Sequence, residues 1–176
     1  MIFLYRILTF FLFPIFVIII FIRRYFNKED KIRYKEKLSI NESFTPKNKK
    51  VIWVHAASIG ETNSVFPLIA RLTKDNENTF VLLTSTTLSS SQLIEKKKFN
   101  KNNLQHRFFS LDVQFLVKKF LNCWKPELVI FVDSEVWPNY LIEISKRKIP
   151  LILLNARITM KTFSRWKLIS RLAFNL

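Results

Sequence analysis

Hydrophobic and polar positions divide the chain into three regions. Residues 2–22 are almost continuously apolar, residues 25–49 are polar and basic, and short apolar runs alternate with helical patterns from residue 50 onward. The short runs are rich in Val, Ile, Leu and Phe, and the stretches between them repeat apolar residues three and four positions apart. This alternation predicts a doubly wound α/β domain, in which helices cover both faces of a parallel sheet.

The same pattern gives approximate bounds for each element. Strands are predicted at 51–55, 79–84, 105–110, 128–132 and 150–154. Helices are predicted at 62–72, 89–99 and 113–124, and from the turn at 137–139 to about Lys146. Because Gly60 is the only glycine, the chain contains neither a Walker motif nor a GxGxxG fingerprint.

The first apolar region predicts a membrane-anchor helix over residues 1–24. Arg6 is its one charged residue before Arg23, and Pro14 lies near its middle. The unbroken part, 7–22, is shorter than the roughly 20 residues of a straight spanning helix. No small-residue cleavage site follows, which disfavours a secretory signal peptide. A single span and a tilted, half-inserted helix both remain open.

A basic juxtamembrane linker is predicted over residues 25–49. Its cationic residues and those just before it are Arg23, Arg24, Lys28, Lys31, Arg33, Lys35 and Lys37. The positive-inside tendency places the following domain in the cytoplasm. Such residues attract anionic lipids by about 1 kcal/mol each when they lie close to a membrane surface.

Charge indicates an anionic partner but does not choose it. The chain has 29 Lys and Arg residues against 13 Asp and Glu residues, a formal net charge of +16. Nucleic-acid binding is disfavoured because the basic residues are not interleaved with stacking aromatic residues. A single cysteine, Cys123, excludes an internal disulfide, and the two histidines show no ligand spacing, so no metal site is predicted.

Two acidic turns stand out in the predicted sheet. Glu61 follows the first strand directly after Gly60, while Asp133 and Glu135 follow the fourth. The carboxyl ends of parallel strands lie at one edge, so these carboxylates can meet and serve in proton and group transfer. Alternatively, Glu61 and Glu135 are acids placed at helix N-termini by the macrodipole. Gly60 is expected to adopt a backbone conformation closed to other residues, or to admit a ligand closely.

Three separated motifs resemble the amino-terminal half of the 3-deoxy-D-manno-octulosonic acid (Kdo) transferases. They are His-Ala-Ala-Ser-Ile-Gly-Glu at 55–61, Asp-Ser-Glu-Val-Trp-Pro-Asn at 133–139 and Asn-Ala-Arg-Ile at 155–158. The resemblance implies a two-domain GT-B glycosyltransferase at the cytoplasmic face of the inner membrane. Such an enzyme transfers Kdo from CMP-Kdo to a lipid A precursor in lipopolysaccharide biosynthesis, without a metal or other cofactor. Residues 50–176 would be its Rossmann-like, acceptor-binding domain.

The resemblance also assigns roles to individual residues. Glu61 matches the proton acceptor, Asp133 matches a glutamate that stabilises the transition state, and Glu135 matches the second glutamate of that motif. Aspartate is one methylene shorter, a change that can cost activity where catalytic geometry is tight. Arg157 is expected either to bind an acceptor phosphate or to pair with Glu135. The remaining expected acceptor contacts are Ser58, Gly60, Thr84, Thr86 and Asn155.

Members of that family continue into a CMP-binding domain, whereas this sequence stops at Leu176 inside an amphipathic segment, 163–176. Two expectations follow from the resemblance. The chain is the acceptor half of an enzyme whose carboxyl-terminal half is encoded separately, or it is a noncatalytic, membrane-tethered lipid-binding remnant.

Overall fold

The computed structural model describes residues 2–40, 48–74, 78–97, 99, 102–133 and 136–156. Within these residues, five strands form one parallel sheet in the order β3-β2-β1-β4-β5. The strands are β1 (Lys50–His55), β2 (Thr79–Ser85), β3 (Leu104–Phe108), β4 (Leu128–Val132) and β5 (Leu151–Leu154). The predicted α/β class is confirmed.

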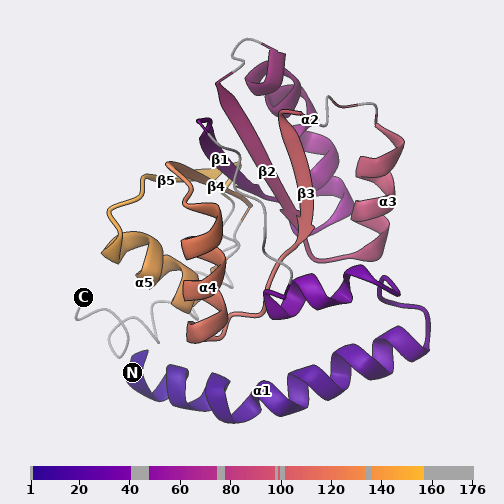
Figure 1. Ribbon diagram of the computed structural model, residues 1–176, viewed down its shortest axis with the longest axis vertical. Coiled ribbons are helices and arrows are strands. Elements are labelled where there is room, and N and C mark those ends of the chain that lie inside the picture. Colours follow the sequence, from indigo (N-terminus) through magenta and orange to yellow (C-terminus); the bar gives the residue numbers. More distant parts are fainter. Residues whose placement is uncertain are drawn as a thin grey trace.

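Four helices cover the sheet in two pairs (Figure 1). They are α2 (Ile59–Lys74), α3 (Leu88–Lys96), α4 (Gln114–Trp124) and α5 (Pro138–Lys146). Successive residues of β1 point to opposite faces: Trp53 joins a core with residues of α4 and α5, and Val54 joins one with residues of α2 and α3. The central strands β1, β2 and β4 are largely buried on both faces and mainly apolar, whereas most of the edge strand β5 is exposed. The domain is doubly wound, since helices cover both faces of the sheet.

The chain reverses its direction of travel across the sheet between β1 and β4. From β1 it moves outward to β2 and β3, and from β4 it moves the opposite way to β5. The carboxyl ends of β1 and β4 therefore flank a topological switch point. Ligands of open α/β sheets bind in the crevice outside such a point.

The apolar amino-terminal region forms a single helix, α1 (Ile2–Tyr25), which contains Pro14. By length and composition, α1 is able to cross a membrane. It runs across the edge of the domain toward which the strand arrows point, below the carboxyl ends of the strands (Figure 1). Contacts with the loop after β3 and with the start of α5 fix it there: Tyr5 bonds to Asp112, and Arg6 bonds to Asn139.

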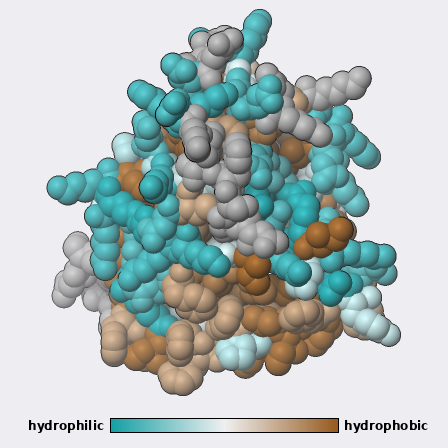
Figure 2. All heavy atoms as spheres, in the orientation of Figure 1, coloured by the Kyte–Doolittle hydropathy of each residue, from teal (hydrophilic) through white to brown (hydrophobic). Residues whose placement is uncertain are grey.

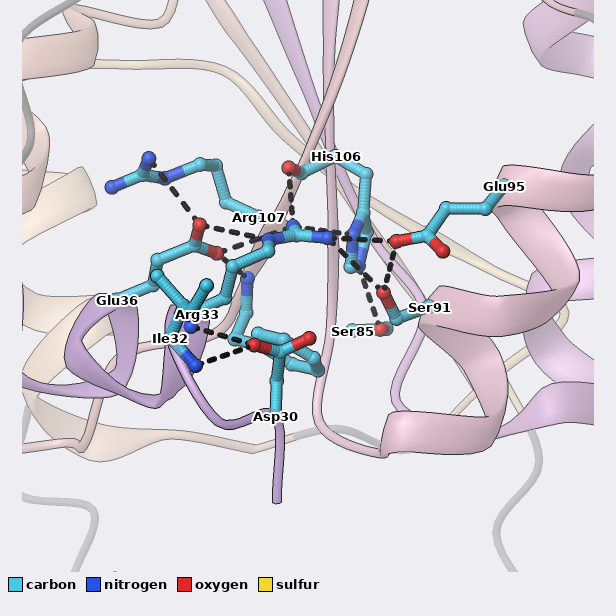
Figure 3. A network of polar contacts seen from close by, with 10 residues as sticks. Asp30, Ile32, Arg33, Glu36, Ser85, Ser91, Glu95, His106 and Arg107 are labelled. Atoms are coloured by element: carbon cyan, nitrogen blue, oxygen red, sulfur yellow. Dashed lines mark hydrogen bonds and ion pairs between the residues drawn. The ribbon is translucent and has the colours of Figure 1, made fainter. Parts of the chain in front are cut away.

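A short 3-10 helix, η1 (Arg33–Leu38), packs against β3 within the region predicted as a linker. Figure 3 shows Arg33 at the centre of its contacts. The guanidinium donates to both carboxylate oxygens of Glu36, at 3.0 and 3.3 Å, and to Ser91 and Glu95 of α3, each at 3.2 Å. Part of segment 25–49 is thus an integral layer of the domain.

Arg33 also fixes the protonation of His106 on β3. Its Nη2 lies 2.9 Å from His106 Nδ1. Arginine can only donate, so Nδ1 accepts and the imidazole proton lies on Nε2, which donates to Ser85 Oγ at 2.9 Å. Burial, together with the neighbouring charges of Arg33 and Arg107, lowers the pKa of His106 to about 3.

Two of the seven cations predicted to contact lipid head groups are turned into the domain instead. Arg33 pairs with Glu36, and Lys37 Nζ lies 2.6 Å from Glu29 Oε2. Glu29 and Glu36 are 3% and 7% exposed, so each needs a cationic partner inside the fold. The head-group prediction is therefore wrong for Arg33 and Lys37.

Candidate functional site

Glu61 occupies the first turn of α2, where it forms a reciprocal cap with Ser58. Ser58 Oγ donates to Glu61 Oε1 at 2.7 Å and accepts from the Glu61 backbone N–H at 3.3 Å. The second carboxylate oxygen, Oε2, accepts from the backbone N–H of Ala57 at 2.8 Å. The spacing is that of a Ser-x-x-Glu capping box, with the difference that the glutamate accepts from Ala57, the residue before the cap, instead of from the Ser58 backbone.

The capping geometry holds the Glu61 carboxylate at the surface. Glu61 is half-buried, and Ser58, Ile59 and Gly60 beside it are exposed. The side chain is thus oriented by two donors at its base while remaining open to a ligand. The Glu61 side chain can therefore be both a helix cap and an accessible base, and the two interpretations of this residue from the sequence are compatible.

Gly60 does not bend the backbone in the way the sequence suggests. It lies within α2, its φ is not positive, and an added Cβ would meet nothing closer than Ser58 Oγ at 3.9 Å. The prediction of a conformation closed to other residues is wrong because the strand-to-helix turn is made by residues 56–58. Close approach of a ligand at Gly60 stays a prediction.

Asp133 and Asn155, rather than Gly60, adopt left-handed backbone conformations at the carboxyl edge of the sheet. Their φ angles are 58° and 56°, a region that Asp and Asn enter more readily than other non-glycine residues. Asn155 Nδ2 donates to Asp133 Oδ1 at 2.8 Å, and the Asp133 N–H donates to the carbonyl of Leu154 at 2.9 Å. The ends of β4 and β5 are joined by these bonds.

The two acidic turns lie at one edge of the sheet, as predicted. His55 of β1 pairs in register with Phe131 of β4, and Glu61 and Asp133 both follow the carboxyl ends of these adjacent strands. The topological switch point lies between them. The other two residues assigned to this region, Glu135 and Arg157, lie outside the described residues.

Thr86 lies beside the Glu61 turn, and Thr84 does not reach it. Thr86 Oγ1 donates to the carbonyl of Ala57 at 2.8 Å, and Lys37 Nζ donates to the carbonyl of Thr86 at 3.0 Å. Together with the Ala57 bond to Glu61, these contacts link η1, the end of β2 and the start of α2. Thr84 is fully buried, with its hydroxyl 2.9 Å from both Trp53 Nε1 and His55 Nδ1, so it supports the strand ends from within.

Lys37 is a residue of this edge that sequence reasoning assigned to the membrane. Burial lowers its pKa, and the contact with Glu29 opposes that shift. The sequence does not reveal this position of Lys37, because it lies in a run of similar basic residues. The pattern of the run does not distinguish a cation that pairs with an internal carboxylate from one that lies in solvent. The neighbouring acids Glu29 and Glu36 are the signal that was available.

Asp112, in the loop after β3, bonds directly to the start of α5, although the two lie far apart in the sequence. Its carboxylate accepts from the backbone N–H groups of Asn139 and Tyr140, at 3.2 and 3.1 Å, and from Tyr5 Oη at 2.7 Å. Burial raises the pKa of Asp112, and these three hydrogen bonds oppose that effect. α5 follows directly on the acidic turn, so Asp112 positions one wall of the site. No sequence motif joins residues so far apart.

The residues that the structure describes contain no group of three or more His, Cys, Asp or Glu able to hold a metal ion. The arrangement instead offers carboxylates, hydroxyls and an amide around a strand switch point. Such groups suit the binding of a polyhydroxylated ligand and the removal of a proton from one of its hydroxyls.

Comparison with known proteins decides the family. A family model described as 3-deoxy-D-manno-octulosonic-acid transferase matches residues 32–176, which include η1, the whole sheet and both turns. The chain belongs to the Kdo transferase family. The match begins one residue before η1, in agreement with the packing of that helix against β3.

Curated Kdo transferases from distant organisms resemble the same region. A Rickettsia bellii protein of that name is 39% identical over 164 residues, covering 93% of this chain and 38% of the relative. A probable mitochondrial Kdo transferase from Arabidopsis thaliana is 35% identical, covering 93% of this chain and 36% of the relative. A Haemophilus influenzae Kdo transferase is 31% identical over 115 residues, 65% of this chain and 26% of its own.

This chain therefore spans about two fifths of the length of the first two Kdo transferases it matches. The shared part contains the sheet whose carboxyl edge carries Glu61 and Asp133. The architecture described above is consistent with the amino-terminal domain of a Kdo transferase.

Proposed function

We propose that this domain forms the acceptor side of an inverting sugar transfer from CMP-Kdo to a lipid A precursor. The observation that carries the proposal is the placement of Glu61 and Asp133 after adjacent strands at the switch point of the sheet. A sugar-nucleotide-binding region completes the site, supplied either by further sequence or by a separate polypeptide. The relatives named Kdo transferases support the substrates.

In the proposed reaction, Glu61 removes the proton of an acceptor hydroxyl. The freed oxygen attacks the anomeric carbon of Kdo as the bond from that carbon to the CMP phosphate breaks, and CMP leaves with the bonding electrons. The bonds from Ser58 and Ala57 orient the carboxylate before the acceptor arrives. A positioned general base of this kind contributes about 10²–10⁴-fold to the rate.

The second carboxylate has an electrostatic role in the proposal. The transition state of sugar transfer has oxocarbenium character, so a nearby negative charge stabilises it. Asp133 is held by Asn155 and by its left-handed backbone, and it is half-buried. Glu135 and Arg157 remain proposed partners of the same turn, Arg157 as a donor to an acceptor phosphate.

An apolar groove along α1 suits a lipid acceptor. It lies between α1 and the start of α4 and has a volume of about 600 Å³. Its walls include Phe3, Ile7, Phe10, Phe11 and Phe115, with Arg6 among them. We propose that acyl chains of the acceptor lie along this groove while its sugar hydroxyl reaches Glu61.

The proposal is tested in a chimera of this chain with a full-length relative. In the chimera, this chain replaces the matched 38% of the Rickettsia bellii relative, and transfer of labelled Kdo to a lipid A precursor is measured in membranes. Glu61→Gln should lower the rate at least about 10²-fold. Glutamine also serves at this position of a capping box, so the fold is retained while the base is lost.

Glu127→Gln is the matched control, since Glu127 is an exposed acid that precedes β4 at the opposite edge of the sheet. It should transfer Kdo at the unaltered rate. Undiminished activity in Glu61→Gln would reject the assignment of the base.

A noncatalytic, lipid-binding role is the second candidate. It is favoured by Asp133, which stands where the family motif has a longer glutamate, and by the full engagement of both Glu61 oxygens in the cap. A folded chimera that binds the lipid A precursor but transfers no Kdo would support this role over the enzymatic one.

A further inference from the structure

α1 presents one apolar stripe to the outside along its whole length. The stripe residues recur at alternating intervals of four and three, so they share one helix face. They are 50–73% exposed: Leu4, Leu8, Phe11, Ile15, Ile18 and Ile22. Figure 2 shows hydrophobic side chains gathered along the side of the molecule where α1 lies, with hydrophilic ones above.

The opposite face of α1 is fixed to the domain near its amino-terminal end by polar contacts. Tyr5 Oη donates to Asp112 at 2.7 Å, and Arg6 Nη2 lies 3.3 Å from Glu143 Oε1. Asp112 and Glu143 are 7% and 4% exposed. Without α1, these two carboxylates would lose partners in surroundings where an isolated charge is costly.

The carboxyl-terminal end of α1 is fixed to the same domain. Arg23 Nε donates to Glu29 at 2.7 Å, and Glu29 also pairs with Lys37 of η1. The ring of Phe21 packs edge-on against Tyr34, with 5.6 Å between centroids. Both ends of α1 therefore contact the same domain.

These attachments are incompatible with a helix that crosses a bilayer. Arg6 and Arg23 are separated by about 26 Å along the helix at 1.5 Å per residue, close to the roughly 30 Å of a hydrocarbon core. In a span, one of the two would lie on the far side from the domain. Both bind the domain, so α1 stays on the domain's side of the membrane.

The charges beside α1 indicate what covers the apolar stripe. Lys28, Lys31 and Lys35 are exposed in and after the turn that follows the helix. An apolar stripe bordered by exposed lysines complements the acyl region and anionic head groups of a phospholipid leaflet.

We propose that α1 lies in the plane of an anionic leaflet, with its stripe in the acyl region and its other face carrying the domain. Because α1 crosses the carboxyl edge of the sheet, that edge is turned toward the leaflet (Figure 1). The inference stands on the contacts of α1 and does not depend on the sugar-transfer activity.

Accessibility of single cysteines in the full chain tests this orientation. In a Cys123→Ser background, Leu4→Cys and Ile22→Cys report the two ends of α1, and Lys74→Cys reports the domain, at the end of α2 away from α1. The chain is reconstituted in phosphatidylcholine vesicles containing phosphatidylglycerol. A membrane-impermeant thiol reagent is then added outside, before and after permeabilisation with detergent.

An in-plane helix holds Leu4→Cys and Ile22→Cys in the acyl region, so both are protected from the reagent until detergent is added, whereas Lys74→Cys is labelled before permeabilisation. A spanning helix places Leu4→Cys on the side of the membrane opposite to the domain, so it is labelled before permeabilisation in the vesicles in which Lys74→Cys is not. That result would overturn the proposal. Nitroxides attached at Leu4→Cys and Ile22→Cys should also report equal, shallow depths, and depths differing by the thickness of a leaflet or more would contradict it.

Charge dependence is tested with vesicles of two compositions. Lys28→Gln with Lys31→Gln should weaken binding to vesicles containing phosphatidylglycerol by on the order of tenfold, and leave binding to pure phosphatidylcholine unchanged. Lys50→Gln with Lys74→Gln is the control, because both lysines are exposed at the amino-terminal edge of the sheet. Equal weakening by both pairs would show a nonspecific charge effect and refute the oriented surface.

Discussion

Asn155 donates from Nδ2 to Asp133 Oδ1 across 2.8 Å, and both residues hold left-handed backbone conformations at the ends of β5 and β4. The pair places one carboxylate of the candidate site without any glycine. The shape of this turn and its charge can be separated by substitution, because asparagine accepts the same conformation and keeps an acceptor oxygen.

We expect Asp133→Asn to leave the free energy of unfolding within about 0.5 kcal/mol of the wild-type value. Asp133→Ala should cost about 1 kcal/mol or more, because alanine is disfavoured at positive φ and loses the bond to Asn155. Urea denaturation of the detergent-solubilised chain measures both. In the chimera, Asp133→Asn should slow Kdo transfer, and a full rate would argue against a role for the charge.

The capping box of α2 makes a prediction about stability alone. Ser58→Ala removes the side chain that accepts from the Glu61 N–H, and we expect a loss of about 1 kcal/mol in the free energy of unfolding. Ser58→Asp retains an acceptor but places a second negative charge beside Glu61, so it should restore only part of the loss. Equal stability of Ser58→Ala and the wild type in urea titrations would show that the cap contributes nothing.

The carboxylate of Asp112 joins α1 and α5, and two variants separate these roles. Tyr5→Phe removes the bond from α1 and should cost about 1 kcal/mol. Asp112→Ala also removes both backbone bonds to the start of α5, and we expect about 3 kcal/mol. Thermal unfolding compares them. Equal losses would mean that the contacts with α5 add no stability.

The neutral histidine on β3 makes stability depend on pH. His106 has a pKa of about 3 in the folded protein and an ordinary value near 6.5 when unfolded. Between these values the unfolded state binds more protons, so stability falls as pH drops through that window. Between pH 7.5 and pH 5 this contribution amounts to about 2 kcal/mol.

His106→Asn isolates the effect, because asparagine retains an acceptor for Arg33 and does not titrate. Urea midpoints at pH 7.5 and pH 5 should differ more for the wild type than for the variant. Identical pH dependences would show that folding does not lower the pKa of His106.

The sequence predicts β1, β2 and β4 well because these central strands are largely buried on both faces. Runs such as 128–132 are uniformly apolar, and the structure places β4 at those residues. The position of Glu61 and Asp133 at one edge followed from topology alone, since parallel strands share their direction. The local structure of the Glu61 turn could not be predicted in this way. Gly60 lies within the helix and Ser58 caps it, in place of the expected bend at glycine.

Contacts between distant segments could not be predicted. Tyr5 and Asp112 are 107 positions apart, and Arg33 and His106 are 73 apart, with no repeat or motif to relate them. Composition made residues 25–49 look like a solvated linker, because pairing with Glu29 and Glu36 is invisible in a basic run. The sequence also cannot distinguish a buried threonine such as Thr84 from one that is exposed to a ligand, because the residue type is the same.

The attachment of α1 at both ends has a consequence for substrate choice. In the proposed orientation it sets the height of Glu61 above the lipid as a spacer of fixed size would. Under the proposed function, a sugar hydroxyl held at that height by its own acyl chains would meet the carboxylate, whereas one on a taller or shorter head group would pass over or beneath it. Selection among lipids would then be a matter of vertical distance, decided before any atom of the sugar is recognised.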